Sequence, residues 1–384
     1  MRVLSIFGTR PEAIKMAPVV MELGKYPGEF ESIVCVTAQH REMLDQVLDL
    51  FEIKPDLDLG LMEENQTLAS LSARVITGLD KVLDSVRPDL VLVQGDTTTA
   101  MVAGLAAFYR QIAVGHVEAG LRTLSRYSPF PEEMNRRLLG ALATYHFAPT
   151  ERAAGALRRE GISEENIFLT GNPVIDALHW IGGRPPSDTT LRLFDSLGLD
   201  NEGDGSQNGL RTLLVTAHRR ESFGRPLAEI CNALGSLVRG NPDIQIVYPV
   251  HLNPNVRRPV FDILGTTPRI HLIDPIPYET LVHLMIRSYL ILTDSGGIQE
   301  EGPAVGKPVL VLREETERPE GVEAGVARVV GTDSSAIVEE AERLLRDPEA
   351  YRRMACTVNP YGDGHAAERI VQIIRERLHQ PGSV

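Results

Sequence analysis

Short apolar runs alternate with helix-length amphipathic segments along nearly the whole chain. Runs of this kind are typical of parallel strands that are buried on both faces, with helices as the crossover connections. The predicted strands of the first half are residues 3–7, 32–36, 90–93, 113–117, 146–148 and 167–169, and those of the second half are residues 212–216, 244–248, 270–273, 289–293 and 309–312. The pattern predicts an α/β protein with two parallel sheets.

A length of 384 residues exceeds what one compact core usually holds, which favours two domains of similar size. Residues 182–209, rich in Gly, Pro, Asp, Ser and Asn, lie between the two series of strands and contain one helical pattern at 190–197. We expect a first domain at residues 1–172 and a second at 173–363. A strongly amphipathic helix is predicted at 364–378.

Charge and cysteine content exclude several classes of partner. The formal net charge is −13 and no basic run stands out, so nucleic acid and anionic membranes are not expected as partners. The three cysteines, Cys35, Cys231 and Cys356, are far apart and form no CxxC pair, so neither a disulfide framework nor a zinc site is expected. A reducing cytoplasm fits this usage. The first apolar run is too short for a signal peptide core, and no segment approaches the length of a membrane span.

A glycine turn between two predicted strands is the clearest candidate for a ligand site. Ser295, Gly296 and Gly297 follow the strand that ends at residue 293 and open a short helix that contains Glu301. Amides at a helix N-terminus lack internal partners and favour an anion, and Arg318 lies beyond the next strand, where it could bind phosphate. An ordinary crossover turn remains the alternative, but the combination favours a nucleotide diphosphate.

The turn after the first strand contains Arg10 and, one turn into the next helix, Lys15. A cation at a helix N-terminus is electrostatically unfavourable, so the presence of Arg10 there indicates that it binds an anion. The alternative is that both side chains are simply solvated in the first turn, and for Lys15 the two interpretations are about equally good. The turn is not a G-x-G-x-x-G fingerprint and no other one occurs, so a bound nicotinamide dinucleotide is not expected.

Carboxylates follow predicted strands of the first half. Asp96 comes after the strand at 90–93, Glu118 ends the strand at 113–117, and Glu132 and Glu133 open a helix after a Ser-Pro-Phe-Pro segment. A carboxylate at the end of a buried strand needs a partner or a function. Asp96 could instead cap its helix, and Glu132 and Glu133 could pair with the helix dipole, which we accept for Glu133. The cations that could order these acids are Arg122, Arg136 and Arg137.

Two histidines end predicted strands of the second half. His218 lies beside two arginines at the end of its strand, where we expect a crevice between the two domains. Open parallel sheets bind ligands beyond their strand ends, which favours a ligand role for His218 over a structural one. His251 ends the next strand and is a second, weaker candidate.

These motifs, taken together, resemble the non-hydrolysing UDP-N-acetylglucosamine 2-epimerases. The resemblance runs from residue 2 to the last helix and includes FGTRPEAIKMAPVV, GDTTTAMVAGLAAFY, GHVEAGLRT, SPFPEEMNR, GNPVIDAL, TAHRRESFG, YPVHLNPNV and LTDSGGIQEEGPAVGKPVLVLREETERPEG. It implies two Rossmann-like domains with parallel sheets facing across a cleft (the GT-B fold), with the C-terminal helix, 364–384, packing back on the first domain. It also implies a cytoplasmic homodimer of a polysaccharide pathway, with no cofactor and no metal.

The resemblance also assigns roles to residues. The catalytic acids are implied to be Asp96, Glu118 and Glu132, with His218 as a further catalytic residue. The implied UDP contacts include Arg10, Lys15, Asp96, Glu118, His218, Ser295, Gly296, Gly297, Glu301 and Arg318. Two positions near the uracil depart from close relatives, since they are Ile276 and Leu281 here, and Tyr278 could supply a ring instead. Gln39 and His40 match a possible allosteric UDP-sugar site, whereas Glu42 and Asn65 depart from it.

The family's reaction requires chemistry that fits these residues. The hydrogen on carbon 2 of the sugar has no neighbouring carbonyl and is barely acidic. Anti elimination of UDP, which gives 2-acetamidoglucal, followed by re-addition, needs general bases on both faces and a stabilised leaving group. The alternatives are a hydrolysing 2-epimerase that releases UDP and N-acetylmannosamine, a 2-epimerase of a UDP-diacetamido uronic acid, a glycosyltransferase, and a non-enzymatic UDP-sugar sensor.

Overall fold

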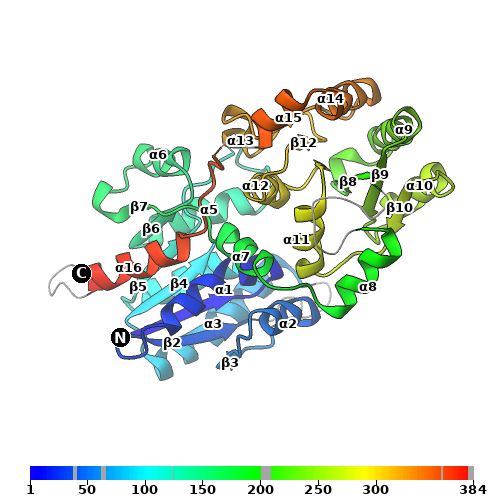
Figure 1. The fold of residues 1–384 in the computed structure, drawn as a ribbon. Coiled ribbons are helices and arrows are strands. Elements are labelled where there is room, and N and C mark those ends of the chain that lie inside the picture. The colour runs from blue at the N-terminus through cyan, green and yellow to red at the C-terminus, as the bar shows by residue number, and fades with distance from the viewer. Residues whose placement is uncertain (38–40, 62–65, 124, 200–208, 356–357, 379–384) are drawn as a thin grey trace. The chain divides into compact units, whose positions relative to one another are not determined.

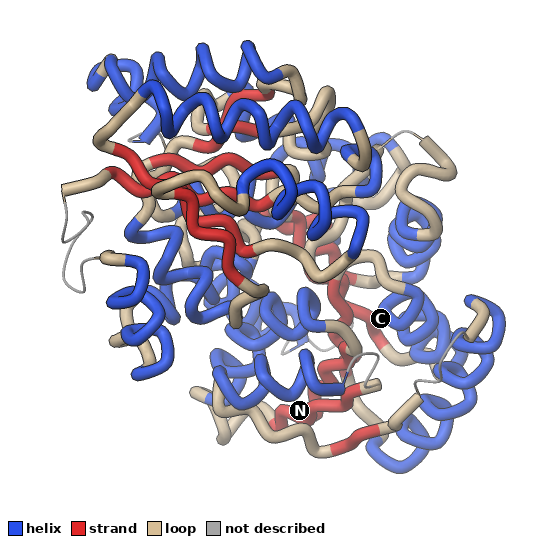
Figure 2. The backbone as a smooth tube through the Cα atoms, turned by 90° about the vertical axis from the view of Figure 1, so that its right-hand side faces the viewer, coloured by secondary structure: helices blue, strands red, loops and turns tan. Residues whose placement is uncertain are grey.

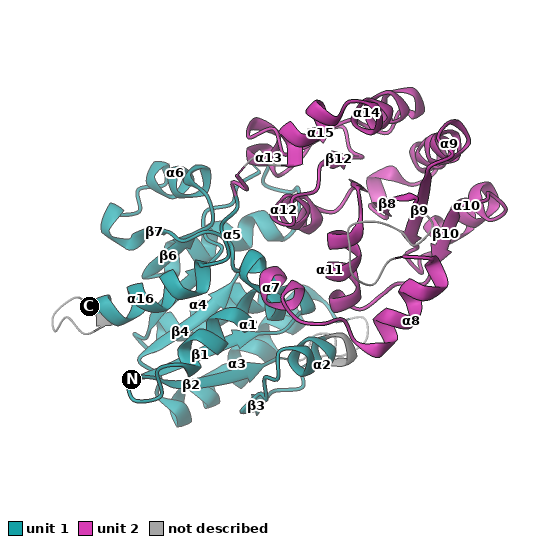
Figure 3. Cartoon of the chain, in the orientation of Figure 1, with its two compact units in different colours: residues 1–177, 361–384 teal, residues 178–360 magenta. Residues whose placement is uncertain are grey.

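The chain folds into two compact units. The computed structural model describes residues 1–37, 41–61, 66–123, 125–199, 209–355 and 358–378. Unit 1 comprises Met1–Ala177 and Tyr361–Val384, and unit 2 comprises Leu178–Pro360 (Figure 3). The chain therefore leaves unit 1 once and returns to it once.

Unit 1 contains a seven-stranded parallel sheet with the order β3-β2-β1-β4-β5-β6-β7 (Figure 1). Its strands are β1 (Arg2–Phe7), β2 (Glu31–Val36), β3 (Leu57–Asp58), β4 (Leu90–Gln94), β5 (Ala113–Val117), β6 (Tyr145–Ala148) and β7 (Ile167–Leu169). Its helices are α1 (Arg10–Gly24), α2 (Arg41–Leu50), α3 (Leu68–Val86), α4 (Thr98–Tyr109), α5 (Glu132–Leu142), α6 (Glu151–Arg159), the first half of α7 (Pro173–Gly182), and α16 (Ala366–Leu378).

The central strands of unit 1 are apolar because both faces of the sheet are covered. Every residue of β4 and of β5 is buried. Helices α3, α4 and α5 pack in sequence beside one another, while α1 packs against α2 and α16. Full burial of one large aliphatic side chain contributes about 1.5–3 kcal/mol, so this core dominates the stability of the unit.

Unit 2 contains a six-stranded parallel sheet with the order β10-β9-β8-β11-β12-β13, and Figure 2 shows helices on both faces of the sheets. Its strands are β8 (Arg211–Thr216), β9 (Ile244–Pro249), β10 (Ile270–Ile273), β11 (Leu290–Thr293), β12 (Val309–Val311) and β13 (Ala327–Val329). Its helices after the second half of α7 are α8 (Asp188–Leu197), α9 (Arg225–Gly240), α10 (Pro254–Leu264), α11 (Tyr278–Arg287), α12 (Gly296–Ala304), α13 (Pro319–Glu323), α14 (Ser334–Arg346) and α15 (Pro348–Ala355).

The predicted fold class, two Rossmann-like α/β units with parallel sheets, is confirmed. Two strands escaped the prediction, β3 with two residues and β13 with three. Both lie at sheet edges, where pairing on one side requires only a short stretch and no continuous apolar run.

The last helix belongs to unit 1. Helix α16 packs on α1. Arg375 of α16 binds Glu29, with Nη2 and Oε1 2.8 Å apart, and the Arg375 guanidinium lies 4.5 Å from the ring centre of Tyr26. Within the described part of the chain, no helix combines the length and the apolar content that crossing a membrane requires.

Candidate active site

The carboxylates of unit 1 gather where neighbouring strands end. Strands β4 and β5 pair in parallel with Gln94 beside Val117, so Asp96 and Glu118 follow at the same edge of the sheet. This is the carboxyl edge, where open parallel sheets bind ligands. The first two predicted acids therefore lie on adjacent loops.

Glu118 is buried and surrounded by hydrogen-bond donors. Lys15 Nζ and Gln94 Nε2 each lie 2.5 Å from its carboxylate, and Asn172 Nδ2 lies 2.8 Å away. An ionised carboxylate accepts hydrogen bonds and donates none, so this environment suits the charged form. Glu118 also has a φ of 63°, a left-handed conformation that is unusual for a residue with a side chain and is found at functional sites.

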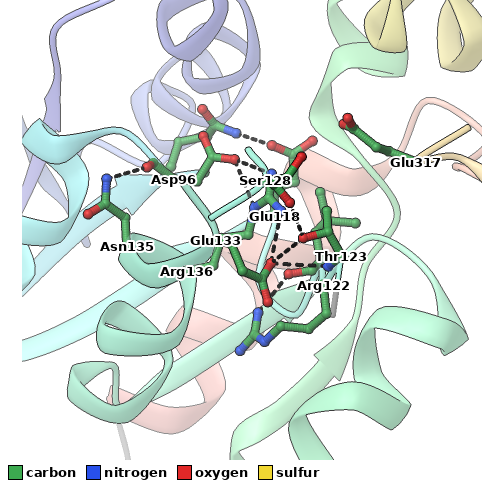
Figure 4. Close-up of polar contacts among 12 residues, drawn as sticks. Asp96, Glu118, Arg122, Thr123, Ser128, Glu133, Asn135, Arg136 and Glu317 are labelled. Carbon is green, nitrogen blue, oxygen red and sulfur yellow. Dashed lines mark hydrogen bonds and ion pairs between the residues drawn. The ribbon is translucent and has the colours of Figure 1, made fainter. Parts of the chain in front are cut away.

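Asp96 is held by a different cation. Arg136 of α5 reaches Asp96 Oδ2 through Nε at 2.8 Å and Nη2 at 2.7 Å, and Asn135 Nδ2 binds the Asp96 carbonyl (Figure 4). The alternative that Asp96 caps helix α4 is wrong, because Thr97 is the N-cap and accepts the Ala100 amide. Asp96 therefore has no structural duty at this helix end, and its side chain remains partly exposed.

Helix α5 contributes two further acids. Glu132 is its first residue, and among the described residues its Oε2 is buried without a hydrogen-bond partner. Glu133 is fully buried, pairs with Arg136 and Arg137, and accepts the Thr123 amide. Its role is therefore structural, as predicted, but ion pairs stabilise it in addition to the helix dipole. Of the three arginines predicted to order the acids, Arg122 instead binds Glu160 at 2.6 Å.

A buried glutamate that the sequence did not single out connects two loops of this edge. Glu12 accepts the amides of Gly8 and Thr9 and the hydroxyl of Thr97. Burial raises the pKa of Glu12, and the hydrogen bonds oppose that shift. Glu12 thus fixes the turn that contains Arg10, the first residue of α1, to the loop that contains Asp96.

A buried histidine supports the loop that contains Asp96 through a hydrogen bond to its backbone. Nε2 of His116, on β5, lies 2.8 Å from the Gly95 carbonyl. Burial lowers the pKa of His116 to about 3, with a smaller contribution from His146 opposite it on β6. Burial likewise lowers the pKa of His146 to about 4. Both rings are therefore neutral at neutral pH, and His116 acts as an uncharged donor to the loop.

In unit 2, Asp294 organises the end of β8. It is fully buried, and its Oδ2 accepts the amides of His218 at 2.6 Å and Arg219 at 2.7 Å. The His218 ring lies with Nδ1 3.5 Å from Asp294 Oδ1 and stacks on His251 with the ring centres 5.4 Å apart. The two candidate histidines thus lie together at the carboxyl edge of this sheet.

The N-terminus of α12 is surrounded by cations. Ser295 is its N-cap but makes no side-chain cap, which leaves the first amides of the helix for another acceptor. A β-carbon added to Gly296 would lie 3.7 Å from Arg219 Nη2 and 3.9 Å from Arg318 Cζ, so both guanidinium groups adjoin the turn. Arg318 is held by an ion pair between its Nε and the buried Glu300. The helix end and its two cations together can bind an anion.

The other predicted contacts of unit 2 lie nearby in sequence and structure. Glu301, buried in α12, accepts the hydroxyl of Tyr278, the first residue of α11. Ile276 precedes α11 and Leu281 lies within it, and both are half-buried. The predicted allosteric positions Gln39 and His40, together with Asn65, lie outside the described residues.

Sequence reasoning overlooked Gln94, Asn172, Glu12 and Asp294 as functional residues. Gln94 ends an otherwise apolar strand, a signal that could have identified it. No sequence signal pointed to Asn172, because the residue that it contacts, Glu118, lies 54 positions away in the chain. Among the described residues no group of three His, Cys, Asp or Glu side chains could hold a metal ion.

Comparisons with known proteins identify the family of the chain. The family model described as UDP-N-acetylglucosamine 2-epimerase matches residues 22–375. The UDP-N-acetylglucosamine 2-epimerase of Escherichia coli K12 is 56% identical over 375 residues, which cover 98% of each chain. The structure of the UDP-GlcNAc 2-epimerase from Neisseria meningitidis, bound to UDP-GlcNAc, is 49% identical with a TM-score of 0.88 and covers 98% of this chain and 100% of that one. An S. aureus protein in a co-structure with UDP is 47% identical with a TM-score of 0.86, covering 100% of this chain and 99% of that one.

The match with the family model extends over most of the chain, and the relatives share about half of its residues from end to end. On this evidence the chain belongs to the UDP-N-acetylglucosamine 2-epimerase family, as its motifs predict.

Proposed function

We propose that this chain interconverts UDP-N-acetylglucosamine and UDP-N-acetylmannosamine by elimination and re-addition of UDP. The family assignment supports the overall reaction. The observation that carries the route is the pair of carboxylates, Asp96 and Glu118, that follow adjacent strands and are each held by a cation. Two separately supported acids suit a reaction that removes a proton from one face of a carbon and returns it to the other.

Unit 2 supplies the groups that would bind the nucleotide. The first amides of α12, which the side chain of Ser295 does not cap, would bind a diphosphate together with Arg219 and Arg318. Asp294 fixes the His218 backbone and lies beside its ring, which would present the imidazole to the leaving phosphate. Stabilising the negative charge on UDP as it departs is the contribution that an elimination needs most.

Unit 1 supplies the acid–base groups. In the first step a carboxylate takes the carbon 2 proton while the carbon 1–oxygen bond breaks, and a carbon–carbon double bond forms in 2-acetamidoglucal. In the second step a UDP oxygen adds to carbon 1 and a proton reaches the opposite face of carbon 2. Asp96, Glu118 and Glu132 are our candidates for these transfers, and Lys15 serves Glu118 as its cation.

A hydrolysing 2-epimerase is the second candidate, because the same carboxylates could direct water to carbon 1. Incubating the protein with UDP-N-acetylglucosamine and following the anomeric proton signals by NMR separates the two. We expect UDP-N-acetylmannosamine at equilibrium with the substrate. Free N-acetylmannosamine with stoichiometric UDP would identify the hydrolysing enzyme instead, and an unchanged spectrum would contradict both.

The family resemblance extends the proposal to the protein's setting. We propose that the protein acts as a homodimer in the bacterial cytoplasm, supplies a polysaccharide pathway, and needs no nucleic acid, metal or nicotinamide. Light scattering of the purified chain tests the dimer, and turnover in the presence of a chelator tests the metal requirement.

A further inference from the structure

We propose that Asn172 is a positioning residue for Glu118 and that it transmits the position of the returning chain at Tyr361 to that carboxylate. The inference rests on the proposed role of Glu118. The structural relationship that carries it is a continuous hydrogen-bonded connection from the Tyr361 carbonyl through Asn172 to Glu118.

Asn172 uses three separate atoms at once. Its backbone amide donates to the Tyr361 carbonyl at 2.7 Å, its Nδ2 donates to Glu118 Oε1 at 2.8 Å, and its Oδ1 accepts the Val174 amide at 3.2 Å. The residue is 1% exposed, so water cannot replace these contacts. Side chains held in this way have one orientation, which the groups that they contact then share.

Asn172 also lies where the chain passes between the units. The chain leaves unit 1 after Ala177 and re-enters it at Tyr361. The residues on either side of this junction, Gly171 and Gly362, have φ values of 85° and 140°, which favour glycine. A β-carbon on Gly171 would lie 3.3 Å from the Gly362 Cα atom, so the two backbones approach closely. A shift of the returning chain is therefore transmitted directly to Asn172.

Asn172 donates to the same Glu118 oxygen that Lys15 approaches at 2.5 Å. The two donors come from different elements, the residue before α7 and the first helix of the unit. Together they fix the direction of the carboxylate rather than only its charge. Removal of Asn172 would leave Lys15 on this oxygen and Gln94 on the other, but it would remove one of the two donors that fix the direction of Oε1.

The first test compares Asn172→Ala, Asn172→Asp and Glu118→Gln. We expect Asn172→Ala to lower kcat on the order of 10²-fold, as a small misplacement of a catalytic group does, without changing UDP affinity. Asn172→Asp places a like charge beside Glu118, so the acidic limb of its pH–activity profile should move to higher pH. A merely structural role would leave the profile unmoved.

A second pair of variants probes the backbone junction and does not depend on Asn172 variants folding. Gly171→Ala and Gly161→Ala introduce a β-carbon at nearly the same φ, 85° and 86°. The added atom meets Gly362 only at position 171, since nothing lies within 4 Å of it at position 161. We expect Gly171→Ala to lower kcat more than Gly161→Ala at equal UDP affinity.

The outcomes are distinguishable. If Glu118→Gln is inactive but the Asn172 variants keep normal kcat and an unmoved pH profile, or the two glycine variants behave alike, the role of Asn172 is refuted and the proposed function stands. If Glu118→Gln retains normal turnover, the proposed role of Glu118 itself is wrong.

Discussion

Lys15 Nζ lies 2.5 Å from Glu118 Oε1, and the two side chains are only 16% and 5% exposed. Shielding strengthens the attraction between the two charges but also removes both from water, which costs free energy. The loss of one partner is therefore costly, because it leaves a buried charge without compensation. The pair joins helix α1 to the end of strand β5.

Replacing Lys15 with Met should therefore affect both folding and turnover. We expect the free energy of unfolding to fall by ~3 kcal/mol, because the Glu118 carboxylate would remain buried without its cation. Chemical denaturation measures this, with Lys25→Met as the control. Lys25 also lies 2.5 Å from a glutamate but is 66% exposed, so we expect its replacement to cost under ~1 kcal/mol. Equal losses in the two variants would contradict the buried pair.

Removal of the charge of either candidate acid should slow turnover while UDP binding is retained. We expect Asp96→Asn and Glu118→Gln each to raise the barrier by ~3–5 kcal/mol, a loss of two to four orders of magnitude in kcat. Asp80→Asn serves as the control, because Asp80 pairs with Arg110 at an exposed site. Isothermal titration with UDP shows whether binding persists. Near-normal kcat in both acid variants would remove these residues from the mechanism.

Arg318 should bind phosphate through its planar guanidinium and not through its charge alone. Its Nε binds Glu300 and its Nη1 donates to the Glu317 carbonyl, while its Nη2 would lie 3.9 Å from a β-carbon added at Gly296. Because lysine lacks the planar fork, we expect Arg318→Lys to weaken UDP binding by about 10-fold. Arg328→Lys, a change of an arginine paired with Glu340 elsewhere in unit 2, should leave affinity unchanged. Similar UDP affinities in both variants would argue against a phosphate contact at Arg318.

The two buried histidines of unit 1 predict an acid sensitivity of the fold. The pKa is lowered from 6.5 to about 3 for His116 and to about 4 for His146. Between pH 6.5 and about 4 the unfolded chain binds protons that the folded chain does not, so the unfolding free energy falls as the pH falls. Each histidine contributes up to ~1.4 kcal/mol per pH unit.

The matched measurement compares the unfolding free energy at pH 7 and pH 5 for the unchanged chain and for a His116→Gln, His146→Gln double variant. We expect the double variant to lose less stability over this interval. His365→Gln, a change at an exposed histidine, should retain the full loss. An identical pH dependence in all three proteins would contradict the burial argument.

The sequence alone predicted the elements that follow from local patterns. Long apolar strands such as β4 and β5 were found because burial on both faces leaves a continuous apolar run. The short edge strands β3 and β13 were not, since two or three residues produce no such run.

The candidate site was predictable where residues follow strands and not where the partners are distant. Asp96 and Glu118 could be placed at one sheet edge because parallel strands end together. Their supporting groups could not, because Arg136 and Asn172 meet them across 40 and 54 residues. Arg122 is a further example, because it binds Glu160 and not the carboxylates nearest to it in the sequence.

The most direct test of the account is the fate of the hydrogen on carbon 2 of the sugar. The protein is incubated with UDP-N-acetylglucosamine in heavy water, and carbon 2 of the product is examined by NMR and mass spectrometry. Elimination and re-addition predict deuterium at carbon 2 of UDP-N-acetylmannosamine. Product that retains the original hydrogen would contradict the proposed removal and return of that proton.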